Sequence, residues 1–174
     1  MKSLTVILHN IRSTYNVGAI LRTCEGLGVT RVIFSGYTPY AGKGLPHEQE
    51  KLRRQIHKTA LGAEEMVDNE YVEDLAGLIA TMRQSGVCIL ALEQAAEAAG
   101  LADFQTEKDR EYALILGEEV NGVPSEILEL SDVILEIPMV GQKESFNVSV
   151  AAGIAVWELM KIPSCKTKCP DKRR

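Results

Sequence analysis

Three short polar side chains stand immediately before the most apolar stretch of the chain. Ser145, Asn147 and Ser149 lead into a run of Val, Ala, Gly, Ile and Trp residues that extends to residue 157. Ser and Asn accept hydrogen bonds from backbone amides at the start of a helix, so Ser145 and Asn147 are expected to open one here. Capping explains one of the three residues but not all of them. We interpret the group as the polar edge of an apolar core, where a ligand could be contacted.

A second group combines an amide, a glycine and an arginine. Gly18 and Arg22 are four residues apart and share a helix face, and Asn16 is placed to cap that helix. The planar guanidinium of Arg22 carries five donors, which suit a phosphate or a developing oxyanion. Gly18 would let another backbone or a ligand approach the same face. The alternative interpretation is a capped helix with a surface arginine.

The third group is the segment Gly117-Glu118-Glu119-Val120-Asn121-Gly122. A glycine at a strand end brings the main chain close to a ligand, and Asn121-Gly122 favours a tight turn with positive φ. The carboxylates of Glu118 and Glu119 could accept hydrogen bonds from ribose hydroxyls, from an arginine or from a substrate amine. The alternative is a polar loop between a strand and a helix with no ligand.

These groups lie on alternating strands and helices. Runs rich in Val, Ile and Leu predict strands at residues 4–9, 29–35, 66–71, 87–92, 113–117 and 133–137. Helices are expected at 17–27, 72–84 and 124–130, from 145–147 onward, and as a short basic helix near the end of an irregular section, 36–58. The alternation is typical of an α/β fold, with a mainly parallel sheet and helices on both faces.

In such a fold, ligands bind beyond the carboxyl ends of the strands. Four predicted strand ends carry polar or glycine residues, and we expect them to meet at one edge of the sheet. They are Asn10-Ile11-Arg12, Leu92-Glu93, the segment 117–122 and the segment 138–147.

Charge and composition narrow the class of protein. The 174 residues are 45% hydrophobic and 25% charged, which is ordinary for a globular domain, and the net charge of −5 excludes nucleic-acid binding through bulk charge alone. Basic residues are nevertheless clustered, in Lys51, Arg53, Arg54, His57 and Lys58 and again in 161–174. Each cluster is either a solvated face or a phosphate-binding surface.

Compartment and metal content follow from what the sequence does not contain. The apolar run near 148–157 is about half the roughly 20 residues of a membrane span. Met1-Lys2-Ser3 leads straight into a strand-like segment rather than a secretory signal. Cys165 and Cys169 have no second ligand pair at a suitable spacing, so no metal site is expected. We predict a soluble cytoplasmic protein with one domain, 1–162, and a basic tail, 163–174.

The three groups together resemble the motifs of the SpoU/TrmH-type RNA 2′-O-ribose methyltransferases of the SPOUT superfamily. The motifs occur in order as Asn16-Val-Gly-Ala-Ile-Leu-Arg22-Thr-Cys, as Ile115-Leu-Gly-Glu-Glu119-Val-Asn-Gly122, and as Ile137-Pro-Met-Val-Gly followed by Ser145-Phe-Asn-Val-Ser149-Val-Ala. The segment Lys58-Thr-Ala-Leu-Gly62-Ala-Glu also looks like a family segment. The resemblance extends over about residues 4–162, nearly the whole chain.

The resemblance implies a fold whose C-terminal part is threaded into a deep trefoil knot, an exception to the general absence of knots. It implies a homodimer, with the last helix and the motif loops at the interface. It also implies S-adenosyl-L-methionine as the cofactor, held by groups around Leu92, Gly117, Ile137, Met139, Ser145 and Phe146.

The implied reaction is methyl transfer to a ribose 2′-hydroxyl of RNA, with tRNA favoured over rRNA because no added RNA-binding domain is visible. In the family, the arginine of the first motif activates the 2′-oxygen, and this chain has Arg22 there, assisted by Asn16, Glu119, Ser145 and Asn147. A guanidinium pKa above about 12 makes a neutral arginine scarce, so we expect Arg22 to anchor the 2′-oxyanion or a phosphate. The expected RNA-binding residues are Lys51, Arg53, Arg54 and Lys58.

Two other classes of protein compete with this interpretation. A catalytically inactive, knotted RNA-binding or assembly protein has no reason to keep Asn16, Arg22, Glu119, Ser145 and Asn147 together. A flavodoxin-like nucleotide-binding enzyme is disfavoured because no Gly-x-Gly-x-x-Gly or P-loop pattern follows the first strand.

Overall fold

The computed structural model describes residues 3–107 and 109–160. A seven-stranded sheet in the order β3-β2-β1-β6-β4-β7-β5 forms its centre, and every strand pair in it is parallel. The strands are β1 (Ser3–His9), β2 (Arg31–Ser35), β3 (Asn69–Val72), β4 (Cys88–Leu92), β5 (Ala99–Gly100), β6 (Glu111–Leu116) and β7 (Val133–Glu136). The helices are α1 (Thr14–Leu27), α2 (Pro46–Ala60), α3 (Ala63–Met66), α4 (Leu75–Gln84), α5 (Ser125–Leu128), α6 (Val148–Met160) and the 3₁₀ helix η1 (Leu101–Asp103).

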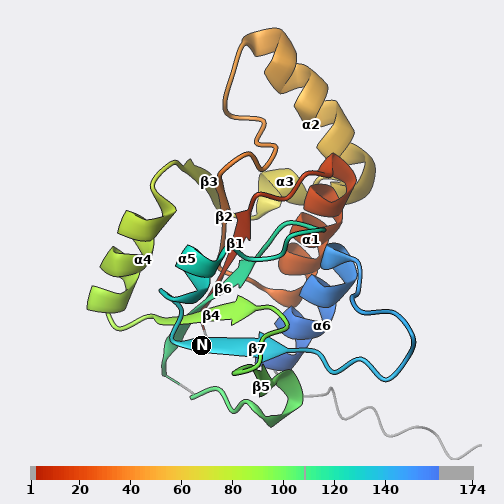
Figure 1. Ribbon diagram of the computed structural model, residues 1–174. Coiled ribbons are helices and arrows are strands. Elements are labelled where there is room, and N and C mark those ends of the chain that lie inside the picture. Colours follow the sequence, from red (N-terminus) through yellow and green to blue (C-terminus); the bar gives the residue numbers. More distant parts are fainter. Residues whose placement is uncertain (1–2, 108, 161–174) are drawn as a thin grey trace, which may run out of the picture.

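Alternating strand residues place helices on both faces of the sheet, which confirms the predicted α/β architecture (Figure 1). On β1, Val6 and Leu8 belong to the core cluster that includes α1 and α6. Ile7 points to the opposite face, where it belongs to a cluster with Leu75 and Ile79 of α4. Strands buried on both faces need the continuous Val, Ile and Leu runs that the sequence shows.

Three local predictions differ from the structure. Ser13, not Asn16, is the N-cap of α1, and its side chain accepts a hydrogen bond from the Asn16 amide at 3.3 Å. The basic helix α2 is 15 residues long because Pro46 begins it well before the basic residues. The short elements β5, η1 and α3 were not expected, since two to four residues give no periodicity to read.

The last helix, α6, is apolar on nearly every side. Its inner face, including Ala152, Ala155 and Val156, is buried against the core. Val150, Ile154 and Trp157 lie along another face at helical spacing and remain 49%, 38% and 59% exposed. A stripe of this kind on a single chain marks a surface that another molecule can cover.

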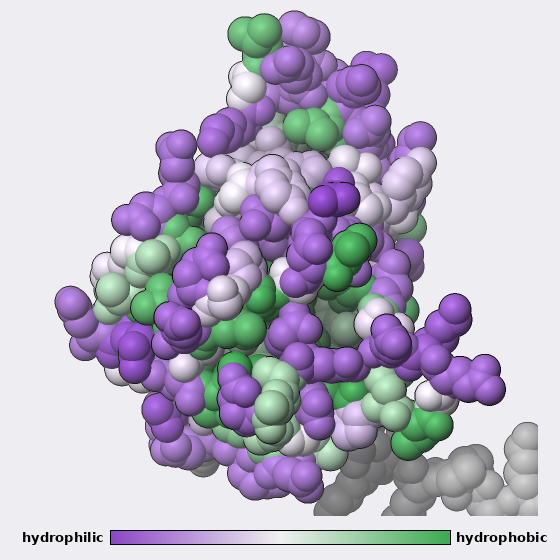
Figure 2. Space-filling model, viewed as in Figure 1, coloured by the Kyte–Doolittle hydropathy of each residue, from purple (hydrophilic) through white to green (hydrophobic). Residues whose placement is uncertain are grey.

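Helix α2 projects from the body of the molecule, and its surface in Figure 2 is largely hydrophilic (Figures 1 and 2). Its C-terminal end rests on the first turns of α1, where Thr59 Oγ1 donates a hydrogen bond to the Tyr15 carbonyl at 2.9 Å. A Cβ atom on Gly18 would lie 2.9 Å from the Ala60 amide nitrogen and closer still to the Ile56 carbonyl. Of the two expected reasons for this glycine, another backbone or a ligand, the structure therefore shows the backbone, which belongs to α2.

The segment 58–64 turns the chain from α2 into α3. Leu61 and Gly62 both have positive φ, and the Glu64 carboxylate accepts hydrogen bonds from the Gly62 amide at 2.9 Å and from His57 Nδ1 at 2.6 Å. These contacts fix the turn between α2 and α3. The tail 163–174, with Cys165 and Cys169, lies outside the described residues.

Within residues 3–107 and 109–160, no helix is both long and apolar enough to cross a bilayer. The same described residues contain no cluster of three or more His, Cys, Asp or Glu side chains arranged to hold a metal ion.

Candidate functional site

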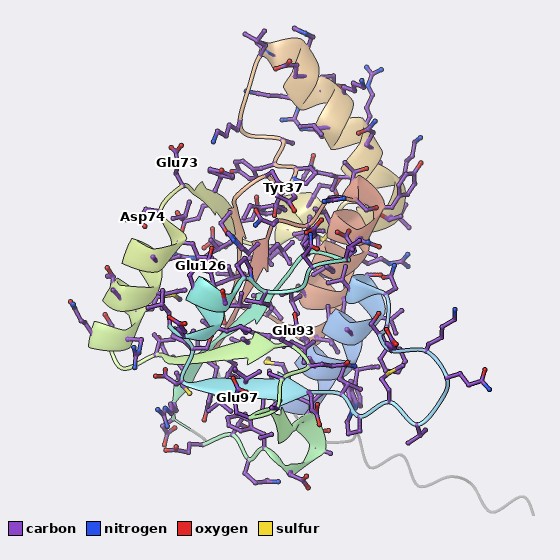
Figure 3. The ribbon with its side chains drawn as sticks, viewed as in Figure 1. Tyr37, Glu73, Asp74, Glu93, Glu97 and Glu126 are labelled. Atoms are coloured by element: carbon purple, nitrogen blue, oxygen red, sulfur yellow. The ribbon has the colours of Figure 1, made fainter. Side chains whose placement is uncertain are left out.

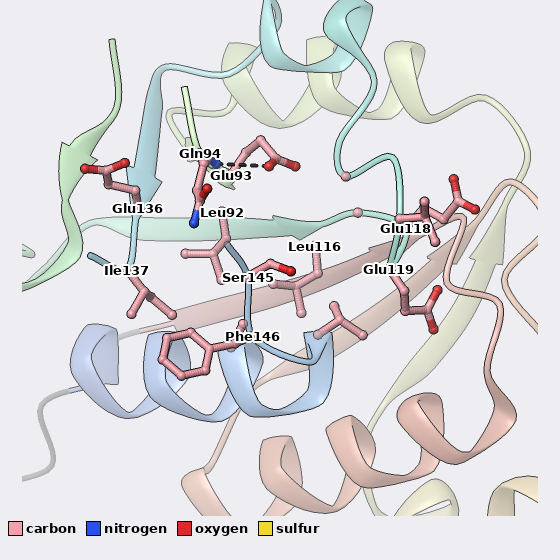
Figure 4. A pocket seen from close by; sticks show the side chains of 15 residues that line it. Leu92, Glu93, Gln94, Leu116, Glu118, Glu119, Glu136, Ile137, Ser145 and Phe146 are labelled. Carbon is pink, nitrogen blue, oxygen red and sulfur yellow. Dashed lines mark hydrogen bonds between the residues drawn. The ribbon is translucent and has the colours of Figure 1, made fainter. Parts of the chain in front are cut away.

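The four polar strand ends meet at one edge of the sheet. Strands β1, β6, β4 and β7 are consecutive neighbours and run parallel, so the segments that follow them emerge side by side. A pocket opens there between the sheet edge and α6 (Figure 4). Its lining residues are Leu92, Glu93, Gln94, Leu116, Gly117, Glu118, Glu119, Val120, Gly122, Glu136, Ile137, Ser145, Phe146, Val148 and Ala151.

The loop after β6 closes on itself. The backbones of Glu118 and Gly122 exchange two hydrogen bonds of 3.0 Å, and Gly122 has the positive φ, 69°, that the Asn121-Gly122 pair predicted. A Cβ atom on Gly117 would collide with the backbone of Gly122 and Val123. Gly117 is thus required first by the fold of this loop, and the flat backbone that results also forms part of the pocket wall.

The carboxylate of Glu119 joins this loop to the start of α1. It accepts hydrogen bonds from the Arg12 amide at 3.0 Å, the Ser13 amide at 3.2 Å and Asn16 Nδ2 at 2.8 Å. Burial acts to raise the pKa of Glu119, but these three hydrogen bonds and one from its own backbone outweigh burial and hold the pKa below its ordinary value. Glu119 is therefore an anion at neutral pH with both oxygens already occupied.

A hydrogen-bonded chain continues from Glu119 to α6. Asn16 accepts a 3.2 Å hydrogen bond at Oδ1 from Asn147 Nδ2. Asn147 in turn accepts from the Ser149 amide at 2.8 Å and from Ser149 Oγ at 2.6 Å, and its carbonyl accepts the first helical bonds of α6. The prediction that Asn147 opens this helix is confirmed, whereas Ser145, which was expected to open it as well, precedes the helix, which starts at Val148. The structure thus connects one residue from each of the three motifs.

Other predicted site residues stand apart from this chain. Arg22 is exposed on α1, about 9 Å along the axis from Asn16 at 1.5 Å per residue. In the described part of the molecule it forms no hydrogen bond or ion pair with Glu119 or Asn147. Ser145 lines the pocket but is not a member of the hydrogen-bonded chain.

Most residues expected around the cofactor lie in the pocket wall. Leu92, Gly117, Ile137, Ser145 and Phe146 are lining residues, and Figure 4 shows Ile137 and Phe146 on the side of the pocket away from Glu119. Met139 is absent from the lining of this pocket. Their roles toward a ligand remain predictions.

The sequence interpretation noted Glu93 only as part of a polar strand end and did not consider Gln94, which follows it. Glu93 accepts a hydrogen bond from the Val123 amide at 2.8 Å, and Gln94 Nε2 donates to the Glu144 carbonyl at 2.6 Å. Two loops of the pocket wall are therefore tied to the end of β4. The sequence did contain a signal for this role. A carboxylate and an amide directly after a buried strand can form hydrogen bonds with the loops on either side.

Arg12 was also named only as part of a strand end. Its guanidinium pairs with Glu118, whose side chain is only 5% exposed and whose Oε2 accepts a hydrogen bond from Asn121. Of the alternatives considered for these carboxylates, an arginine is the partner that Glu118 has within the chain. The pairing offsets the cost of burying the Glu118 charge.

The basic cluster of α2 is partly neutralised within the helix. Arg53 and Arg54 both pair with Glu50, at 3.3 Å and 2.8 Å, while Lys58 lies 5.9 Å from the centre of the Tyr15 ring. The side chains of Arg53 and Arg54 are 53% and 77% exposed. They are available to a polyanion that can displace one carboxylate.

Known proteins share both the sequence pattern and the fold. Residues 3–157 match the model of the SpoU rRNA Methylase family. The chain is 31% identical over 161 residues to the 23S rRNA (guanosine-2′-O-)-methyltransferase RlmB of Xylella fastidiosa, covering 92% of this chain and 59% of that protein. It is 30% identical over 159 residues to the tRNA (guanosine(18)-2′-O)-methyltransferase of Thermus thermophilus, covering 91% and 74%.

Among solved structures, the TrmH/SpoU tRNA modifying enzyme of A. aeolicus superposes with a TM-score of 0.77 at 27% identity, covering 92% of this chain and 75% of that one. The AdoMet-bound rRNA methyltransferase of Sinorhizobium meliloti shares the fold, with a TM-score of 0.76 at 24% identity and coverage of 91% and 56%. The chain spans about three fifths of the length of the RlmB relative that it matches. It belongs to the SpoU rRNA Methylase family.

Proposed function

We propose that the protein transfers a methyl group from S-adenosyl-L-methionine to a ribose 2′-hydroxyl of RNA. The observation that carries the proposal is the series of hydrogen bonds from Glu119 through Asn16 to Asn147, which connects the three motifs beside the pocket that Glu119 lines. Family membership and the two 2′-O-methyltransferase relatives support the same reaction.

The residues of the pocket fit this cofactor. Apolar side chains such as Leu92, Leu116 and Ile137 suit a nucleoside, and the lining includes four carboxylates but no lysine or arginine. S-Adenosylmethionine has positive charge on its sulfonium and its amino group, so the field of such a wall favours it. We no longer assign Met139 to the wall of this pocket. The residues proposed to bind the cofactor are Leu92, Gly117, Ile137, Ser145 and Phe146.

The cofactor supplies an activated methyl group on a good leaving group, so the protein must chiefly orient the ribose. Glu119 cannot readily take the proton, because its oxygens are held by amides of Arg12, Ser13 and Asn16 and its pKa is low. We assign Glu119 the task of fixing Asn16, and Asn16 with Asn147 the task of binding the ribose. Arg22 is the proposed anchor of the 2′-oxyanion or an adjacent phosphate, and Ser145 faces the reacting centre.

The projecting helix α2 is the surface that we propose for binding the RNA substrate. We retain tRNA as the favoured substrate, with a cytoplasmic location, although the two relatives act on tRNA and on 23S rRNA. Lys51, Arg53, Arg54 and Lys58 on the projecting α2 are the proposed phosphate contacts, supported by their exposure and position. A polyanion bound there would lie beside α1, whose first turn holds Asn16.

We further propose that the chain between β6 and α6 is threaded as a trefoil knot, as expected for this family, and that the protein acts as a homodimer. The exposed stripe Val150, Ile154 and Trp157 supports the dimer, because water contact with three large apolar side chains on one helix face is unfavourable. Trp157→Glu should turn the dimer into a monomer in size-exclusion chromatography with light scattering. A wild-type monomer at high concentration would contradict the dimer.

The direct test is calorimetry with S-adenosylmethionine, followed by mass spectrometry of ribose methylation in unmodified tRNA and rRNA incubated with the protein. Arg22→Lys should lose most turnover, about 100-fold, and keep cofactor affinity, because a lysine ammonium cannot reproduce the planar fork. Near-normal turnover would remove Arg22 from the mechanism. Cofactor binding without methylation of any RNA would favour the catalytically inactive RNA-binding alternative.

A further inference from the structure

An exposed tyrosine and an arginine stand together beside the pocket, outside the three motifs. Tyr37 follows β2 and is 54% exposed, and Arg12 follows β1 with its side chain 61% exposed. Because β1 and β2 are parallel neighbours, both residues emerge at the sheet edge where the pocket opens. Figure 3 labels Tyr37 near the base of α2 and Glu93 of the pocket further along, at the end of β4.

Unusual backbone fixes the position of Tyr37. Asn10 is a non-glycine residue with a φ of 61°, and its Oδ1 accepts a hydrogen bond from the Tyr37 amide at 3.2 Å. Gly36 also has positive φ, and its carbonyl accepts a 2.6 Å hydrogen bond from the Tyr71 hydroxyl. A left-handed Asn costs free energy that the rest of the fold must offset, and such residues concentrate at functional sites.

Arg12 is fixed just as firmly. Its amide is bound by Glu119, and its guanidinium pairs with Glu118, which is buried. A hydrogen bond accepted by the Tyr37 hydroxyl, followed by the charge of Glu118, raises the pKa of the Arg12 guanidinium. A guanidinium has five N–H donors, more than Glu118 and Tyr37 use, and the Arg12 side chain is still 61% exposed.

We propose that Tyr37 and Arg12 form a nucleotide clamp, in which the Tyr37 ring stacks on a base flanking the methylated ribose and Arg12 binds the adjoining phosphate. An exposed aromatic ring with a neighbouring guanidinium is the combination that binds single-stranded RNA without sequence preference. The clamp rests on the proposed RNA methyltransferase function and adds to it the residues that present the target nucleotide.

Charge around the clamp favours one path for the RNA. Glu73, Asp74 and Glu126 border the α4 and α5 side of the same edge (Figure 3). The basic residues of α2 lie on the α1 side, where Tyr15 and Thr59 join the two helices. A polyanion is repelled from the first side and attracted to the second. The clamp would hold the strand between α2 and the pocket.

The test compares the binding of two fluorescein-labelled RNAs of equal length and charge, a short oligoadenylate and its abasic counterpart, by fluorescence anisotropy. Tyr37→Leu should weaken binding of oligoadenylate about 10-fold, because base stacking is lost, and leave binding of the abasic strand unchanged. Tyr37→Phe lacks the same hydroxyl, which contacts Arg12, but keeps the ring, so it should bind oligoadenylate close to the wild-type level. Arg12→Lys keeps a charge for Glu118 and should weaken both strands about 3-fold, because the fork is lost.

Calorimetry with S-adenosylmethionine on the Tyr37 variants should show unchanged affinity and thereby report an intact fold. If Tyr37→Leu binds both strands as the wild type does, or weakens both equally, the clamp is wrong while the proposed function stands. If the wild type binds neither S-adenosylmethionine nor any RNA, the proposed function fails and the clamp fails with it.

Discussion

The pocket edge and helix α2 differ in how firmly their polar side chains are held. At the pocket edge, charged and amide side chains are held by several partners each, as Glu119 is by Arg12, Ser13 and Asn16. On α2, only Ile56 and Ala60 of 15 residues are buried, and the arginines pair with a carboxylate of their own helix. The first region is organised before any ligand arrives, and the second can rearrange around a ligand.

The difference reflects the two ligands proposed. A small cofactor and one ribose must be held within fractions of an ångström, which requires fixed polar groups with their partners in place. An RNA backbone is long and is bound mainly by charge, which tolerates adjustment. Rigidity at the pocket and freedom on α2 therefore suit one protein that binds both.

The largest effect is expected where the pocket loop has no room. Gly117→Ala puts a Cβ into the backbone of Gly122, so the loop must move, and we expect about 2–3 kcal/mol less stability and at least about 10-fold weaker S-adenosylmethionine binding. Gly141→Ala is the matched control, since a Cβ there meets nothing within 4 Å. If calorimetry gives equal S-adenosylmethionine affinities for the two variants, the pocket edge is not rigid in the way that distinguishes it from α2.

The packing of α2 on α1 can be tested in the same way. Gly18→Ala forces α2 away from α1 and should cost about 1–3 kcal/mol in urea unfolding. Gly26→Ala on the same helix has open space and should stabilise by about 0.5–1 kcal/mol, because alanine favours helix. If Gly18→Ala also weakens RNA binding and leaves cofactor binding unchanged, the two regions are separable. If the variant loses affinity for both RNA and S-adenosylmethionine, α2 and the pocket edge are structurally coupled.

A smaller effect should come from the charge of Glu119. Glu119→Gln removes charge-assisted hydrogen bonds and should lower the free energy of unfolding by only about 1–2 kcal/mol at neutral pH, because solvent screens this partly exposed carboxylate. The folded pKa is below the unfolded one, so the wild-type advantage is complete above about pH 5 and disappears as pH falls through the folded pKa. Urea titrations of both proteins across this range measure it. A gap that stays constant down to pH 3 would mean that the charge is not what stabilises the loop.

The smallest effect per residue is expected on α2. Replacing Arg53 and Arg54 with Gln should weaken RNA binding a few-fold and change the free energy of unfolding by less than about 0.5 kcal/mol. The slope of log K against log salt concentration should become less steep by about 1 to 2, because one or two phosphate contacts are lost. Arg31→Gln with Arg83→Gln is the control, because both arginines are paired with carboxylates and lie at the opposite edge of the sheet. If the two double variants bind RNA alike, α2 is only a solvated face.

Several features of the fold follow from local sequence alone. The buried strands and the apolar face of α4 come from residue type and spacing, and the structure confirms them within a few residues. Asn16 is the instructive failure. Its position near a helix start predicted a cap, but Ser13 provides the cap and the Asn16 side chain is left for Glu119. Two capping residues close together cannot be ranked from propensity, because the choice depends on what else each side chain can reach.

The sequence by itself determined the α/β class, the three motifs and the family that they indicate. Only the tertiary structure decided which motif residues meet, because Asn16 lies 103 positions from Glu119 and 131 from Asn147. Contacts over such separations depend on the order of the strands in the sheet, which brings β1, β6, β4 and β7 together regardless of their order in the chain. Tyr37 and Arg12 show the same division, since neither has a motif and each gains its place from the end of a neighbouring strand.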